Sequence, residues 1–246
     1  MIKQVRPRDE LIEKLEFYLQ FQHLLAGQRL PSERDLCELW NVNRSTLRSA
    51  LKILEKKGLI YSEPGKGYFK KKGKLLRNLQ SMHSLIETAQ DQGFKLQTRV
   101  LKSSVIDCDT YLSSRLIIEK GHPVFELIRL RYLDDIPAMI EYSYLNTEYC
   151  CGIETVDFKR NSLYKTLEKR CSLNPKQGKQ KISVTKLTKS EAKLLDSEVG
   201  SSAIFLNGNT FDSKDLDHPI EFFKSIIRTD LVEFSSTLKV IKVKEN

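Results

Sequence analysis

The stretch from Ser32 to Gly58 constrains the fold of this chain more than any other part of its sequence. Ser32 is a favourable helix N-cap, and Asp35, three residues later, can bond back to the cap. After a short apolar stripe comes a turn at 41–43, where Asn43 is a favourable N-cap for a second helix. Glycine commonly ends a helix, so the second helix should end just before Gly58. The stretch therefore predicts a short helix, a tight turn and a longer helix.

The longer of these helices has two unlike faces. Its apolar residues recur at intervals of three and four, at Leu47, Ala50, Leu51 and Leu54. Its basic residues recur at every fourth position and form what we call the basic ridge, Arg44, Arg48, Lys52 and Lys56. Residues with these spacings lie on opposite sides of a helix, so one side can pack while the other presents positive charge. A helix buried on all sides would leave the basic ridge unexplained.

Flanking elements complete a recognisable unit. Residues 8–23 carry apolar side chains at helical spacing and predict a helix before the pair. After Gly58, the sequence LIYSEPGKGYFKKK has two short strand-forming runs around a Pro-Gly-Lys-Gly turn and predicts a β-hairpin. Three helices followed by such a hairpin form a winged helix-turn-helix. In this fold the second helix crosses the DNA backbone and the third enters the major groove.

The distribution of charge agrees with a DNA-binding unit at the N-terminal end. The chain has 246 residues and a net charge of +9. Residues 1–74 hold 16 Lys and Arg against 9 Asp and Glu, whereas the remainder holds 25 against 23. A basic segment attracts polyanions such as nucleic acid or an anionic membrane, although a solvated charged surface is the simpler explanation. The place of the basic ridge on the third helix favours nucleic acid.

Residues 75–246 predict a second domain of mixed α+β class. Its helix-like stretches are 75–92, 113–120, 161–169 and 189–199. Its strand-like segments are 98–107, 123–132, 137–145, 180–187, 203–211 and 219–228. A cluster of lysines between Lys70 and Lys74 marks the junction. The expected organisation is therefore a DNA-binding domain at 1–74 and an α+β domain at 75–246.

Several classes of protein are disfavoured by what the sequence lacks. No apolar run approaches the roughly 18 residues that cross a bilayer, and the chain opens on charged residues, so we expect a cytoplasmic protein without membrane contact. Five cysteines without CxxC spacing or nearby histidines indicate neither a zinc site nor a disulfide framework. We therefore expect reduced cysteines, no metal and no cofactor. No catalytic triad, Walker loop or dinucleotide motif is visible, which disfavours an enzyme.

Two stretches resemble known families. LPSERDLCELWNVNRSTLRSALKILEKKGLIYSEPGKGYF resembles the GntR family of bacterial transcription regulators almost continuously. The second domain resembles the UTRA effector-binding domain of the HutC subfamily, which has a chorismate-lyase-like fold. The segments that carry this resemblance are SLIETAQDQGFKLQTRVL, LIRLRYLDDIPAMIEYSYL, NSLYKTLE, KSEAKLLDSEVGSSAIFL and HPIEFFKSIIRTD. The resemblance implies a homodimeric, ligand-responsive regulator, most often a repressor, that binds a double-stranded DNA operator.

The resemblance also implies a set of DNA contacts. The Ser-Glu-Arg arginine would reach the phosphate backbone, the start of the third helix would meet base edges and phosphates, and the wing would enter the minor groove. These positions are Arg34, Asn43, Arg44, Ser45, Thr46, Arg48, Gly65, Lys66 and Gly67. Arginine matches the guanine O6 and N7 edge, and glycine lets the backbone approach closely. The alternative for Arg34 is an ion pair within its own helix.

An effector site is expected in the second domain. Arg129 and Arg131 share one face of a predicted strand, roughly 6.8 Å apart along it, and suit an anion. In relatives such arginines act with a serine and a hydrophobe at a helix start, here Ser84 and Leu85, whose free N–H groups also suit an anion. The resemblance adds the remaining positions, Glu141, Ser162 and Glu221. The expected effector is a small anionic metabolite, either a sugar phosphate or a carboxylate.

Several alternatives stay open at this stage. In one alternative, Glu141 pairs with Arg131 across a predicted hairpin and has no role in ligand binding. In another, Ser162 is the N-cap of a helix and does not contact the ligand. Ile227 stands where a tyrosine is usual in the family, which makes the pocket more apolar, and Arg228 is expected to pair with Asp230. At the level of the whole protein, the alternatives are a nonspecific or architectural DNA binder whose second domain only dimerises, and an enzyme of chorismate-lyase-like fold.

Overall fold

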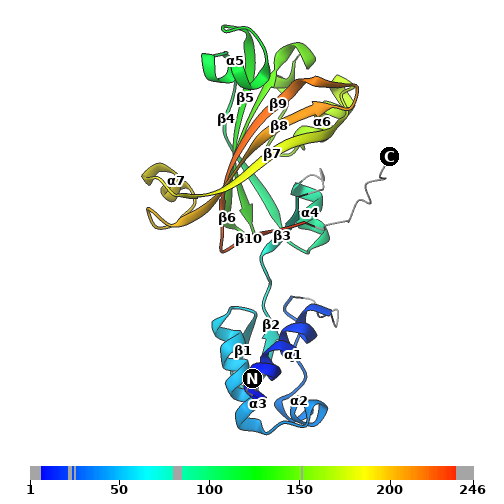
Figure 1. Cartoon of the computed structure of the whole chain (residues 1–246), viewed down its shortest axis with the longest axis vertical. Coiled ribbons are helices and arrows are strands. Elements are labelled where there is room, and N and C mark those ends of the chain that lie inside the picture. Colours follow the sequence, from blue (N-terminus) through cyan, green and yellow to red (C-terminus); the bar gives the residue numbers. More distant parts are fainter. Residues whose placement is uncertain (1–6, 22–23, 25, 80–84, 151, 237–246) are drawn as a thin grey trace, which may run out of the picture. The chain divides into compact units, whose positions relative to one another are not determined.

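The chain divides into two compact units, Met1–Gly73 and Lys74–Asn246. The computed structural model describes residues 7–21, 24, 26–79, 85–150 and 152–236 (Figure 1). Within these ranges, no helix has both the length and the apolar composition that a membrane span requires. Each unit has its own buried core.

Three helices and a hairpin make up the first unit. They are α1 (Pro7–Phe21), α2 (Glu33–Trp40), α3 (Arg44–Lys56), β1 (Ile60–Glu63) and β2 (Gly67–Lys70). Ser32 caps α2 in a full capping box with Asp35, and Asn43 caps α3 by accepting from the amide of Thr46. The helix boundaries agree with the sequence because these caps are local signals.

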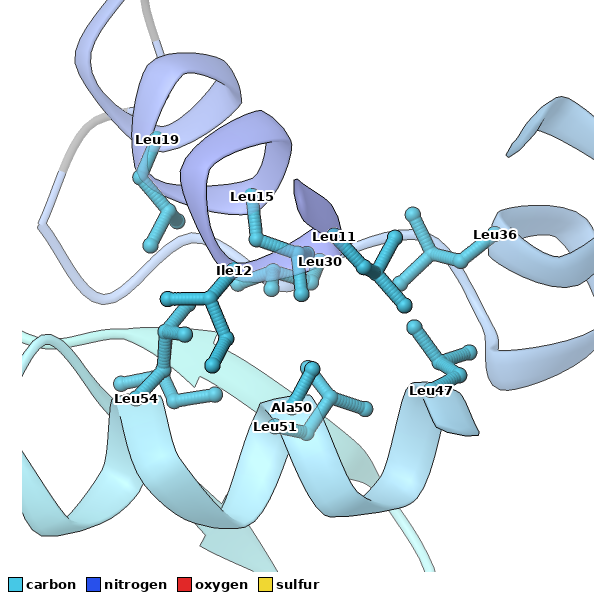
Figure 2. Packing of buried hydrophobic residues seen from close by; sticks show 11 residues of the cluster. Leu11, Ile12, Leu15, Leu19, Leu30, Leu36, Leu47, Ala50, Leu51 and Leu54 are labelled. Atoms are coloured by element: carbon cyan, nitrogen blue, oxygen red, sulfur yellow. The ribbon is translucent and has the colours of Figure 1, made fainter. Parts of the chain in front are cut away.

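Leucines from the three helices form the core of this unit. Leu11, Leu15 and Leu19 of α1 face Leu47, Leu51 and Leu54 of α3, and Leu36 of α2 closes one side (Figure 2). Each of the three α3 leucines has no exposed surface. Because the apolar face of α3 is buried here, its opposite face with the basic ridge is exposed.

The hairpin forms the wing. β1 and β2 pair antiparallel, from Ile60 opposite Lys70 to Glu63 opposite Gly67. Gly65 and Gly67 have φ angles of 75° and 101°, which other residues adopt only with strain. The segment before α2 extends this sheet, because the Leu30 amide donates to the carbonyl of Tyr68.

A six-stranded antiparallel sheet dominates the second unit (Figure 1). Its spatial order is β4 (Leu96–Asp107), β5 (Pro123–Leu133), β6 (Ile136–Asn146), β9 (Asp215–Arg228), β8 (Ser202–Asp212) and β7 (Pro175–Lys186). The helices are α4 (Leu85–Asp91), α5 (Thr110–Leu116), α6 (Leu163–Cys171) and α7 (Lys189–Leu194), with short 3₁₀ turns η1 (Thr147–Tyr149) and η2 (Ile153–Thr155). Four buried clusters fix the helices to the sheet.

The expectation of a helix from residue 75 is wrong at its start. Leu75–Asn78 forms a strand, β3, which pairs in parallel with β10 (Val232–Ser235). Only Leu85–Asp91 of the expected helix is helical among the described residues, since 80–84 lie outside them. The partner strand is near the other end of the chain, so no local pattern could reveal the pairing.

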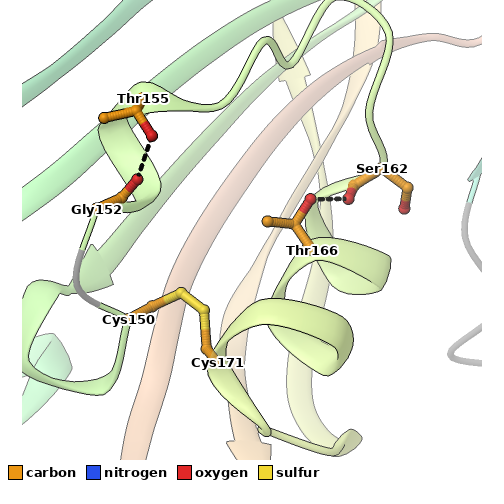
Figure 3. The surroundings of a disulfide bond; sticks show 6 residues. All are labelled: Cys150, Gly152, Thr155, Ser162, Thr166 and Cys171. Carbon is orange, nitrogen blue, oxygen red and sulfur yellow. Dashed lines mark hydrogen bonds between the residues drawn. A yellow bond between two sulfur atoms is a disulfide. The ribbon is translucent and has the colours of Figure 1, made fainter.

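Two cysteines also differ from the expectation of reduced thiols. Cys150, after η1, and Cys171, at the end of α6, form a disulfide, with Cα atoms 5.1 Å apart (Figure 3). Cys37 and Cys108 are free thiols, and Cys151 lies outside the described residues. No CxxC spacing signalled this pair, because the two residues meet only when α6 packs beside η1, which brings their Cα atoms within disulfide range.

The disulfide leads to a first prediction. The bond closes a loop with a sequence separation of 21, so reducing it should lower the free energy of unfolding by about 3 kcal/mol. Denaturant unfolding with and without a reductant measures this difference. Cys171→Ser should remove the effect of the reductant. Equal unfolding midpoints for the oxidised and reduced wild-type protein would contradict the prediction.

Candidate functional site

The basic ridge lies on the exposed face of α3. All four of its residues are exposed. Two of them bind one carboxylate from α2, since the Nε atoms of Arg44 and Arg48 lie 2.8 and 3.0 Å from oxygens of Glu33. Burial opposes the charged form of Glu33, but the hydrogen bonds from the two arginines hold its pKa below its usual value. Glu33 thus orients two guanidinium groups at the N-terminal end of α3.

The first turn of α3 is ordered by Asn43. Its Oδ1 accepts from the amide of Thr46 at 2.8 Å and from the hydroxyl of Ser45 at 2.7 Å. Asn43 and Ser45 are exposed, and Thr46 is partly buried. These side chains therefore lie beside the exposed arginines at the same helix end, as a contact surface for bases and phosphates requires.

Arg34 and the wing have ion-pair partners. Arg34 binds Glu38 on its own helix at 2.9 Å, which is the alternative considered from the sequence. Its side chain is 85% exposed, so the weak surface pair leaves it accessible to a phosphate. Lys66, at the tip of the wing between Gly65 and Gly67, binds Glu63 at 2.9 Å.

One basic residue beside the wing was missed from the sequence. Arg29 precedes α2 and is exposed. It bridges to Phe69 of β2, and its guanidinium lies 3.5 Å from where a Cβ on Gly67 would be. In the sequence, Arg29 is a single basic residue in a loop. Its position beside the wing depends on the bridge between this loop and Phe69, which no local pattern predicts.

A small cavity of about 90 Å³ lies in the second unit. Its walls include six of the predicted effector residues, Leu85, Arg129, Arg131, Glu141, Ser162 and Glu221. They come from α4, β5, β6, β9 and the start of α6. The seventh predicted residue, Ser84, lies outside the described residues. Segments far apart in the sequence therefore converge on one cavity.

Glu141 bridges the two arginines of β5. It accepts from Nε of Arg131 at 2.7 Å and lies 3.2 Å from Nη2 of Arg129. The strand register places Glu141 opposite Arg129, so the expected cross-strand partner, Arg131, is diagonal to it. Burial alone would raise the pKa of Glu141, but the two arginines lower it to about 2. Burial and the neighbouring Arg131 lower the pKa of Arg129 to about 10.

Arg129 retains an unused donor. It is 5% exposed, and its Nε is buried without a hydrogen-bond partner in the described structure. Arg131, by contrast, uses its Nε on Glu141 and its Nη1 on Thr98 at 2.5 Å. A buried donor without an acceptor costs free energy, which an entering anion would recover.

Hydroxyl groups surround the other carboxylate. Glu221 is 2% exposed and accepts from Thr210 at 2.9 Å and from Tyr164 at 3.0 Å. Burial raises the pKa of Glu221, although these hydroxyls and that of Ser143 oppose the rise. Burial and the nearby Glu221 raise the pKa of Tyr164 well above its usual value, so Tyr164 serves as a neutral donor.

The start of α6 leaves a hydroxyl available. Ser162 occupies the N-cap position, yet its side chain makes no capping hydrogen bond (Figure 3). Its carbonyl accepts from the hydroxyl of Thr166 at 2.8 Å. The capping alternative therefore does not account for the Ser162 side chain, which belongs to the cavity wall.

Strand β9 follows the expected alternation. Glu221, Phe223 and Ser225 line the cavity, and Ile227 is fully buried in the adjacent cluster with Leu85. Arg228 points elsewhere and binds Asp230 at 2.6 Å, as expected.

Further cavity residues were missed from the sequence, among them Tyr164 and Arg77. Tyr164 is the second residue of α6, and Arg77 lies on β3. Arg77 was missed because its segment was predicted to be helical and no motif contains it. With Arg77, three guanidinium groups line a cavity that has only two carboxylates among its described walls. Such a site can hold an anion through charge-assisted hydrogen bonds.

Two family models match the chain. The UTRA domain model matches residues 91–233, and the model described as "Bacterial regulatory proteins, gntR family" matches residues 7–69. The HTH-type transcriptional repressor NagR of Bacillus subtilis is 28% identical over 227 residues, covering 92% of this chain and 91% of that protein. The probable fructoselysine utilization operon transcriptional repressor of Escherichia coli is 26% identical over 190 residues, covering 77% of this chain and 78% of that protein.

Solved structures share the fold. PhnF from Mycobacterium smegmatis has a TM-score of 0.71 at 24% identity, covering 94% of this chain and 99% of that chain. The possible transcriptional regulator YydK from Bacillus subtilis has a TM-score of 0.58 at 20% identity, with the same two coverages of 94% and 99%. The fold class expected from the sequence, a helix-turn-helix domain followed by a UTRA-type α+β domain, is confirmed.

Proposed function

Since the chain belongs to the GntR family of bacterial regulatory proteins and carries a UTRA domain, we propose that it is a transcriptional repressor released from its operator by a small anionic metabolite. The chain is a DNA-binding transcriptional regulator, and the curated relatives NagR and the fructoselysine protein are named repressors. The sign of regulation, the operator and the effector are the parts that we propose.

The basic ridge supports DNA recognition by α3. Arg44 and Arg48 are exposed at the helix start, and Glu33 orders both in the unbound protein. Arginine in the major groove binds guanine O6 and N7 in a bidentate geometry, whereas the wing lysine suits a phosphate. We propose that α3 reads bases and that Arg34 and the wing hold the backbone.

The observation that carries the effector proposal is the buried, unbonded Nε of Arg129 in a cavity lined by arginines. A carboxylate or phosphate would supply the missing acceptor. The hydroxyl of Ser162 and the neutral donor Tyr164 would bind its polar groups. We propose a sugar phosphate or a carboxylated metabolite as the effector class.

We also propose that the protein acts as a cytoplasmic homodimer. A two-fold dimer presents two recognition helices to the two halves of a pseudo-palindromic operator. A ligand that binds one arrangement of the dimer more tightly shifts the population toward it. Release follows if the helix spacing in that arrangement no longer fits the operator.

A ligand screen tests the function as a whole. A thermal-shift assay of the full chain against sugar phosphates and carboxylates should find a compound that raises the melting temperature, because it binds only the native state. The same compound should dissociate the protein from a selected operator in a gel shift. A protein that binds all DNA equally, with no responsive compound, would instead be a nonspecific binder.

A second prediction concerns Arg48. Arg48→Ala should cost about 1 to 3 kcal/mol of operator binding and relax the base preference, because one bidentate contact is lost. Binding-site selection from a random DNA pool measures the preference, and gel shifts at several salt concentrations measure affinity.

Lys66→Ala is the matched control. Lys66 is exposed on the wing, and its loss should weaken binding to all sequences evenly. Arg48→Ala with an unchanged base preference would show that Arg48 does not read the operator.

A further inference from the structure

Arg77 enters the cavity from an element outside the main sheet. It lies on β3, which pairs only with β10 among the described strands. Its guanidinium carbon lies 5.7 Å from the ring centre of Phe234 on β10, which holds the group by a cation–π contact. The guanidinium is therefore positioned by the β3–β10 pair on the wall that it shares with Arg129 and Arg131.

The three arginines differ in how their charge is balanced. Arg129 and Arg131 share one carboxylate, that of Glu141. Among the described residues, no carboxylate lies within ion-pair distance of Arg77, and Glu141 reaches it only through a longer-range attraction. Arg77 is partly buried, and this burial lowers its pKa, as expected for a cation without a close partner.

The second carboxylate, Glu221, attracts Arg129 but makes no ion pair with Arg77. The hydrogen bonds of Glu221 come from the hydroxyls of Tyr164 and Thr210, and burial raises its pKa. Three guanidinium groups face two carboxylates, so the cavity walls have an excess of about one positive charge, and Arg77 is the arginine without a directly bound carboxylate. A cation without a close partner attracts a doubly charged ligand about twice as strongly as a singly charged one.

We propose that Arg77 makes the cavity selective for a doubly charged anion, of the phosphate monoester type, over a singly charged one. This inference rests on the proposed effector site and deepens it, because it chooses between the phosphorylated and carboxylated classes. Without Arg77, two guanidinium groups face two carboxylates, and the added advantage of a second negative charge on the ligand is lost.

Two small esters of the same shape and different charge test the proposal. At about pH 8 methyl phosphate carries two negative charges, because its second pKa is near 6, whereas methyl sulfate carries one. Calorimetry on the full chain should show methyl phosphate binding at least about 10-fold more tightly than methyl sulfate, since 10-fold corresponds to about 1.4 kcal/mol. In Arg77→Gln this ratio should fall below about 3-fold, with the larger loss on methyl phosphate.

Two variants serve as controls. Arg77→Lys keeps the charge and should keep most of the preference, even if the contact with Phe234 weakens. Arg99→Gln removes one charge from an exposed arginine on β4 and should leave the ratio unchanged. Because the readout is a ratio within one variant, a general loss of stability does not imitate the effect.

The outcomes separate this inference from the function on which it rests. If the wild-type protein binds neither ester, the proposed anion site is wrong and the role of Arg77 falls with it. If the wild type binds both esters equally, or Arg77→Gln keeps the preference for methyl phosphate, the anion site stands and the role of Arg77 is overturned.

Discussion

Arg131→Ala is expected to weaken binding of methyl phosphate about 100-fold or more while leaving DNA binding intact. The change removes charge-assisted hydrogen bonds worth roughly 1.5 to 3 kcal/mol each. It also removes one of the two ion-pair partners of Glu141, because the Arg131 Nε lies 2.7 Å from that carboxylate. Arg129 remains beside Glu141 and favours its ionised form, so the carboxylate that has lost Arg131 would repel an entering anion. Calorimetry of the full chain measures the binding.

Operator release provides the functional readout of the same variant. A sugar phosphate that dissociates the wild-type protein from its operator should no longer dissociate Arg131→Ala, whose DNA-binding unit is unchanged. Arg131→Lys keeps the charge without the planar fork and should keep part of the response. If Arg131→Ala is released at the wild-type concentration of ligand, Arg131 does not hold the effector.

Leu51→Ala is expected to unfold the DNA-binding unit selectively. Leu51 has no exposed surface and packs among the leucines of α1 and α3 (Figure 2). Its truncation should cost about 2 to 5 kcal/mol, which is a large share of the stability of a domain of this size. The melting temperature of the unit should fall by more than about 10 °C.

The sequence supplies a selective probe for this experiment. Trp40 is the single tryptophan of the chain, and it packs against the core of the first unit. Its fluorescence follows that unit, while calorimetry follows both. Lys52→Ala, at the exposed neighbouring position on α3, should change neither transition by much. If Leu51→Ala lowers both transitions together, the two units do not unfold independently.

The two parts of the candidate site differ in how far the sequence could predict them. The α3 surface is a local feature, because the spacing of Arg44 and Arg48 against Leu47 and Leu51 specifies which face is exposed. The cavity is a long-range feature. Strand alternation placed Arg129 and Arg131 on one face, but Glu141 joined them by a register that only the folded hairpin defines.

The remaining cavity residues show the same limit. The resemblance to relatives pointed to Ser162 and Glu221, whereas nothing in the sequence pointed to Arg77. Its strand is stabilised by pairing with Val232–Ser235, and its guanidinium is held by Phe234. A segment whose partner lies far along the chain has no local signature, so its helical appearance was misleading.

By itself, the sequence determined the elements that depend on neighbours in the chain: capped helices, the wing turn with its glycines, and alternating strands. Hydrogen bonds and side-chain contacts within a few residues specify such elements. The tertiary structure alone decided the β3–β10 pair, the meeting of Cys150 with Cys171, and the third arginine of the cavity. These depend on contacts between distant segments, which form only when the burial of a common core offsets the entropy of closing the loops between them.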